Sequence, residues 1–200
     1  MQEDTTPPMY RSLLLPWSTH PSAREAAYGA QGLLRTHGTI FTAPPPDQVL
    51  RESFNAPPRP KSRMSSGAIA LCKHFERGGG SSEHGRPHPF WTLPRGSNEA
   101  KTAMAAEALE RMLGEAVWRN VMLLHAGVAV YEIRNPRGWG MLWTLEVEAR
   151  RRRGRGHRGD IGGGERERDG DDDAVRDWVI RKTAFRGFVE PIEEMDHEIP

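Results

Sequence analysis

The sequence predicts an α+β fold, in which a small antiparallel sheet of four to five strands packs one principal helix on one face. Three observations support this fold class. Residues 97–116 show a helical apolar period, short runs rich in β-branched and aromatic residues follow them, and hairpin-type turn residues separate those runs. Five of the six tryptophans come after Phe90, so the core-forming residues are concentrated in the second half of the chain.

The principal helix is predicted over residues 97–116. Ser97 or Asn98 can cap its start by accepting a hydrogen bond from a free backbone N–H, and Glu99 suits the positive end of the helix dipole. Gly114 marks the last turn. The apolar residues fall on one broad face, as expected for a helix that packs on a sheet: Met104, Ala105, Ala108, Leu109, Met112, Leu113 and Ala116.

The strands of the sheet are predicted after this helix. Residues 121–124, 128–134 and 139–147 have strand composition. Residues 135–138 read Asn-Pro-Arg-Gly, a turn in which proline presets φ and glycine accepts a positive φ. A last strand is predicted at residues 185–190, antiparallel to its neighbour.

Residues 1–65 are predicted to be a disordered, proline-rich leader. Ten of the sixteen prolines lie within the first sixty residues, and proline favours extended, solvated chain. A short helix around residues 23–34 is the alternative, which Gly29 and Gly32 weaken.

The folded domain is predicted to comprise residues 66–148 and 174–191, and to open with a short buried strand at residues 68–72. Residues 149–173 form a low-complexity charged loop, in which an arginine-rich run precedes glycines and an acidic run. A segment with almost no apolar residues has nothing to anchor it, so disorder is expected. Residues 192–200 are predicted to be a tail.

Composition excludes several classes of protein. The net charge is +1, and no apolar run approaches the roughly 20 residues of a membrane-spanning helix, which predicts a soluble protein. Cys72 is the single cysteine, so a disulfide-stapled secreted fold is excluded and a reducing compartment is expected. Cytoplasm or nucleus fits best. Residues 9–46 resemble an organelle transit peptide, which makes mitochondrial targeting the alternative.

The loop at residues 77–95 is the favoured ligand site. Backbone N–H groups of a glycine-rich turn can converge on an anion, and serine and arginine add donors and charge. The helix start at Ser97 is a second place where an anion is stabilised. A flexible surface loop is the alternative. The candidate ligand-binding residues of the loop itself are Arg77, Gly78, Gly79, Gly80, Ser81, Ser82, Arg86 and Arg95.

Histidines in and before the same loop are candidates for catalysis. His74, His84 and His88 can act as general acids or bases. Together with Cys72 they supply the four donors that tetrahedral zinc needs, although their spacing matches no common zinc module. A buried thiol and solvent-facing histidines are the alternative, and no cofactor is indicated.

The sequence thus supports three hypotheses of function. The first is a small domain that binds a phosphate-bearing or other anionic ligand, with RNA or a nucleotide as candidates, because glycine, serine and arginine are combined in the loop at residues 77–95. The second is a structural or interaction protein whose tails and charged loop recruit partners. The third is a histidine-based enzyme that uses the loop.

Overall fold

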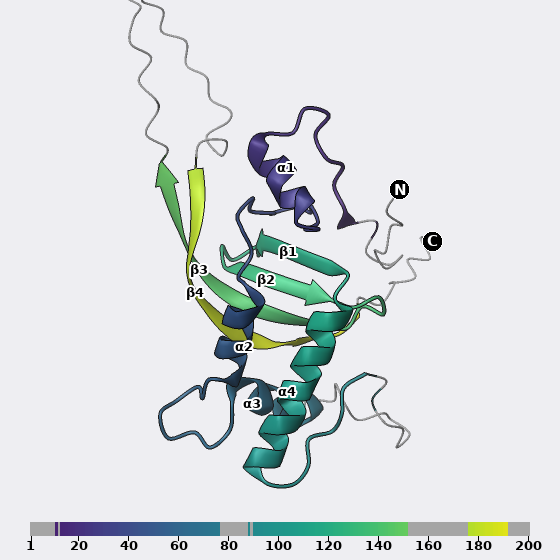
Figure 1. Ribbon diagram of the computed structural model, residues 1–200, viewed down its shortest axis with the longest axis vertical. Coiled ribbons are helices and arrows are strands. Elements are labelled where there is room, and N and C mark those ends of the chain that lie inside the picture. The colour runs from purple at the N-terminus through teal and green to yellow at the C-terminus, as the bar shows by residue number, and fades with distance from the viewer. Residues whose placement is uncertain (1–10, 12, 77–87, 89, 152–175, 192–200) are drawn as a thin grey trace, which may run out of the picture.

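The structure is a computed structural model that describes residues 11, 13–76, 88, 90–151 and 176–191 (Figure 1). It confirms the α+β class, since helices cover one four-stranded antiparallel sheet. None of the helices in these ranges combines the length and apolar character needed to cross a bilayer. The elements are α1 (Ala23–Ala30), α2 (Asp47–Asn55), α3 (Ser66–His74), α4 (Asn98–Glu115), β1 (Trp118–Leu123), β2 (Ala129–Arg134), β3 (Gly140–Arg151) and β4 (Arg176–Val189).

The sheet is an antiparallel meander with the strand order β1-β2-β3-β4. The predicted turn between β2 and β3 is present: Asn135 Oδ1 accepts hydrogen bonds from the backbone N–H of Arg137 at 3.0 Å and of Trp139 at 3.1 Å. Gly138 has a φ of 88°, which glycine adopts at little cost. Beyond their pairing with β1 and β2, strands β3 and β4 continue as a two-stranded ribbon (Figure 1).

Helices α2, α3 and α4 pack on one face of the sheet (Figure 1). Ser97 caps α4 as predicted, its hydroxyl accepting from Ala100 N–H at 3.2 Å. The predicted apolar face of α4 is the buried one, formed by Ala105, Ala108, Leu109, Met112 and Leu113. The principal helix and its orientation are therefore confirmed.

The prediction of a disordered leader over residues 1–65 is wrong for the described part. Helices α1 and α2 lie in it, and Tyr28, Leu50 and Phe54 are among its core residues. The prolines flank the helices: Pro46 is the N-cap of α2, where a missing N–H costs nothing. A capping box at Ser22 and Glu25 starts α1, and this Ser-x-x-Glu pattern was readable in the sequence.

The leader also closes one edge of the sheet. Residues 34–40 run along the outer edge of β1, where Ile40 N–H donates to Val121 O at 2.8 Å. The Tyr28 hydroxyl accepts from Val121 N–H at 2.8 Å and donates to Asn120 Oδ1 at 2.8 Å. These buried hydrogen bonds tie α1 to β1, so the leader is part of the domain.

The predicted strand at residues 68–72 is wrong, because α3 spans this run. Ser65 caps the helix by accepting from Ala68 N–H at 3.1 Å. Gly67, Ala68 and Leu71 form its buried side. A short apolar run fits a buried strand and a buried helix equally well, and only the cap distinguishes them.

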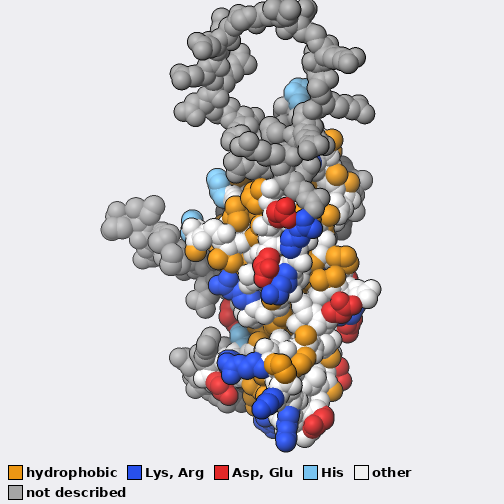
Figure 2. Space-filling view, turned by 90° about the vertical axis from the view of Figure 1, so that its left-hand side faces the viewer, with side chains coloured by type: hydrophobic (Ala, Val, Ile, Leu, Met, Phe, Trp, Pro, Cys, Tyr) orange, Lys and Arg blue, Asp and Glu red, His pale blue; other side chains and the backbone are white. Residues whose placement is uncertain are grey.

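The end of β3 overlaps the segment predicted to be a charged loop, residues 149–173. β3 continues to Arg151 and β4 starts at Arg176, while residues 152–175 lie outside the described part, as does the tail at 192–200. On the ribbon, Arg181 pairs with Glu148 at 2.6 Å and Lys182 with Glu146 at 3.0 Å. Figure 2 views the molecule from the left-hand side of Figure 1, and it shows basic and acidic side chains interspersed over the middle of that face.

Candidate functional site

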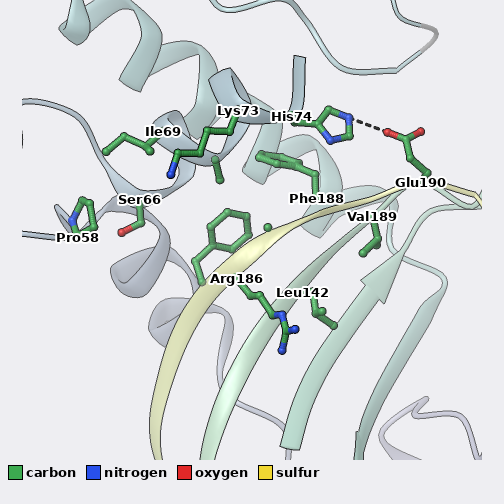
Figure 3. Close-up of a pocket in the computed structure, with 13 residues that line it drawn as sticks. Pro58, Ser66, Ile69, Lys73, His74, Leu142, Arg186, Phe188, Val189 and Glu190 are labelled. Atoms are coloured by element: carbon green, nitrogen blue, oxygen red, sulfur yellow. Dashed lines mark ion pairs between the residues drawn. The ribbon is translucent and has the colours of Figure 1, made fainter. Parts of the chain in front are cut away.

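An open groove of about 770 Å³ lies between α3 and β4 (Figure 3). One wall is a stripe of α3 at helical spacing, formed by Ser66, Ile69, Ala70, Lys73 and His74. The other wall is the end of β4 and the residue that follows it, residues 185–190, with Leu142 of β3 beside them. The groove thus combines apolar side chains with a few charged ones, the usual composition of a ligand site.

A β-bulge decides which side chains of β4 face this groove. Leu142 pairs with Gly187 and the next residue, Trp143, pairs with Phe185, so Arg186 is an extra residue. Phe185 and Phe188 therefore both pack on the helix side, with their ring centroids 5.5 Å apart. Glu190 follows two residues after Phe188 and shares its face. Without the extra residue, the alternation would turn Glu190 to the opposite face.

His74, His88 and Glu190 converge at the end of the groove. His74 Nε2 lies 2.7 Å from Glu190 Oε1, and His88 Nε2 lies 3.9 Å from the same oxygen. The histidine side chains are only 11% and 5% exposed, whereas that of Glu190 is 43% exposed. In Figure 3, His74 and Glu190 point toward each other from the two walls. The carboxyl group is thus the part of the cluster most open to a ligand.

The backbone fixes the tautomer of His88. Its Nδ1 accepts hydrogen bonds from Phe90 N–H at 3.1 Å and Trp91 N–H at 2.8 Å. A nitrogen that accepts has no proton, so the neutral ring carries its proton on Nε2, the atom that faces Glu190. Trp139 holds the ring in place from 4.6 Å between centroids. The Nε2–H of His88 is therefore held toward Glu190, with Nε2 3.9 Å from Glu190 Oε1.

Burial raises the pKa of Glu190 from its ordinary value near 4.5 to about 7, and the positive charge of Arg134 opposes this rise. Arg134 also donates to the backbone O of Glu190 at 2.7 Å and to Gly138 O at 2.7 Å. The end of β4 is thereby tied to the β2–β3 turn. Glu190 consequently exchanges its proton near neutral pH, where an acid–base group is most effective.

The cluster has the composition of a metal site but not its hydrogen bonding. The ligand atoms of His74, His88 and Glu190 all lie within 4.8 Å of one another, which would suit a divalent ion. A histidine that binds metal through Nε2 carries its proton on Nδ1 and donates it outward. In His88 that nitrogen instead accepts two backbone N–H groups. The donor set therefore fits proton exchange better than metal binding.

The structure brings together two of the predicted histidines, His74 and His88, and adds Glu190. Cys72 lies outside the cluster, because residues two apart on a helix point in different directions. Arg95 and Ser97 are exposed and do not line the groove. The remaining predicted residues lie outside the described part: Arg77, Gly78, Gly79, Gly80, Ser81, Ser82, His84 and Arg86.

Sequence reasoning missed Lys73 and Glu190 as site residues, and it did not assign Arg186 to this groove. The helical spacing of Lys73 and His74 with Ile69 would have placed them on one stripe if residues 66–74 had been interpreted as a helix. No local signal marks Glu190, because its orientation depends on the bulge in β4.

Replacement of Glu190 by glutamine tests the state of this carboxyl group. Between pH 4.5 and 7 the folded protein keeps a proton that the unfolded chain has lost, so wild-type stability falls as pH rises through this window. Glutamine has no proton to lose. We expect the stability of Glu190→Gln relative to wild type to increase from pH 4.5 to 7 and then to level off, as measured by urea unfolding. A constant or opposite difference would contradict the raised pKa.

Comparison with protein families, curated proteins and solved structures finds no match for this chain. The fold and the site therefore define it as an α+β domain, built on an antiparallel meander, with a histidine–carboxyl cluster at the end of a groove.

Proposed function

We propose that this protein binds a small organic anion in the groove between α3 and β4. The observation that carries the proposal is that two basic residues, Lys73 of α3 and Arg186 of β4, line this groove. Both are exposed, and neither forms an ion pair with an acid of the described chain. This retains the anionic ligand class that the sequence favours but assigns it to other residues.

The charges around the groove support an anionic ligand over a cationic one. Figure 3 shows Lys73 extending along the helix wall toward Ser66, and Arg186 on the strand side beside Leu142, pointing away from the helix. The acid that lines the groove is Glu190, whose pKa of about 7 leaves it partly protonated at neutral pH. Other basic residues on β4, such as Arg181 and Lys182, are already paired with acids. Lys73 and Arg186 are thus free to interact with an incoming anion.

The walls also carry apolar surface. Ile69 and Phe188 line the groove together with Leu142, so a bare inorganic ion would leave most of it unfilled. A carbon skeleton that bears one anionic group satisfies both the charge and the apolar wall.

Benzenesulfonate is a suitable probe, since it joins an apolar ring to an anion that does not titrate in the working pH range. We expect saturable binding by isothermal titration calorimetry at fixed ionic strength, and no binding of benzyl alcohol, its neutral counterpart. The double variant Lys73→Gln/Arg186→Gln should weaken binding about tenfold, equivalent to roughly 1.4 kcal/mol.

Arg95→Gln is the matched control, because Arg95 is an exposed arginine that does not line the groove. It should bind benzenesulfonate as wild type does. If Arg95→Gln weakens binding and the double variant does not, the anion site is at the start of α4 and the groove proposal is wrong. Absence of saturable binding to the wild-type protein would also refute it.

A further inference from the structure

We infer that His88, Glu190 and His74 form a proton-binding chain, and that an anion enters the groove together with one proton held by this chain. The inference rests on the proposed function, because it concerns the ligand of the same groove. It assigns the cluster to acid–base chemistry on an anionic organic ligand, such as a carboxylate or a phosphate or sulfate ester.

Glu190 lies between the two imidazoles, with its Oε1 2.7 Å from His74 Nε2 and 3.9 Å from His88 Nε2. The Nε2–H of His88 faces Glu190, since Nδ1 accepts from Phe90 and Trp91. Glu190 Oε1 is within hydrogen-bond distance of His74 Nε2, at 2.7 Å. His74 and Glu190 both line the groove, whereas His88 does not.

The charges around Glu190 determine whether its carboxyl group is protonated in the empty groove and in the anion-bound groove. Lys73 from α3 and Arg186 from β4 line the groove, and Arg134 from β2 holds the backbone of Glu190 from the other side. In the empty groove these cations favour the ionised form of Glu190, whereas burial favours the protonated form. A bound anion neutralises part of this positive charge and repels a carboxylate, so it raises the proton affinity of Glu190.

The transfer moves one proton from solvent to Glu190 and from Glu190 to the ligand. A proton from solvent adds to a Glu190 carboxylate oxygen as the anion binds, and the new O–H bond uses an electron pair of that oxygen. The protonated carboxyl group can donate the same proton to a ligand oxygen, which returns Glu190 to the carboxylate. No oxidant, reductant or metal ion takes part in this exchange.

Calorimetry with benzenesulfonate tests the coupling. Titrations at pH 7.5 in two buffers of different ionisation enthalpy should show net proton uptake by the wild-type protein. The affinity should fall several-fold between pH 7 and pH 8, because one bound proton is linked to one bound anion. Glu190→Gln should bind benzenesulfonate with no proton uptake and little dependence on pH.

Two histidine variants distinguish a specific role of His88 from an effect of replacing any histidine. His88→Asn keeps an oxygen that can accept the backbone N–H groups but removes the Nε2–H donor, so we expect the proton uptake to shrink. His125→Asn, at an exposed position beyond β1, should leave it unchanged. Equal effects of the two variants would contradict a positioning role for His88.

A spectroscopic measurement tests the chain without any ligand. The ¹⁵N NMR spectrum of the imidazoles should show His88 as the Nε2–H tautomer. A Nδ1–H tautomer, or stoichiometric binding of cobalt(II) with a visible d–d spectrum, would overturn the inference. Benzenesulfonate binding without proton uptake would overturn it while leaving the proposed function intact, and absence of binding would refute both.

Discussion

Replacement of Leu50 by alanine is expected to lower the free energy of unfolding by about 2–5 kcal/mol, as large-to-small substitutions in a core do. Leu50 lies on α2 and is fully buried, with an exposure of 0%. Its removal leaves a cavity at the contact between the leader and the rest of the domain. A loss of this size is a large part of the total stability of a small domain, roughly 5–15 kcal/mol. Urea unfolding followed by tryptophan fluorescence measures it.

The control is Leu13→Ala in the same leader, because Leu13 is 42% exposed. We expect its effect to stay within about 0.5 kcal/mol, as for most surface substitutions. The pair separates a folded leader from a disordered one. If both variants unfold like the wild-type protein, residues 1–65 contribute nothing to the core and the original expectation of disorder was right.

Replacement of Gly67 by alanine is expected to destabilise the domain by about 1–3 kcal/mol, the usual cost of overpacking. In an ordinary helix the change would be favourable. Here the added Cβ would lie 2.0 Å from Phe54 Cε1. The ring cannot move away easily, because Phe54 is fully buried and its centroid is 4.5 Å from that of Phe185. Helices α2 and α3 would have to separate.

Gly114→Ala is the matched control in α4. A Cβ at Gly114 has no atom within 4 Å, so only helix propensity acts and we expect a gain of up to about 1 kcal/mol. The two substitutions are chemically identical and should have opposite signs in urea unfolding. A gain at Gly67 similar to that at Gly114 would show that α2 does not pack on α3 as described.

About half of the candidate site could be predicted from the sequence. His74 and His88 are candidates because imidazoles close to one loop are suited to acid–base chemistry. Their partner is Glu190, more than a hundred residues away in sequence, and its orientation follows from the bulge at Arg186. Register and bulges depend on how whole strands pair, so no local pattern reveals them. Lys73 was missed for the related reason that α3 was interpreted as a strand.

The sequence by itself determined the elements whose signals are local. The Ser97 cap and the apolar face of α4 are set by residues three and four apart, and the β2–β3 turn is set by Asn135 and Gly138. Only the tertiary structure decided the roles of α1, α2 and α3. Their short apolar runs gain stability by burial against distant strands, and that gain outweighs the weak local preference of a proline-rich segment. The groove and its carboxyl group exist because these packed elements meet.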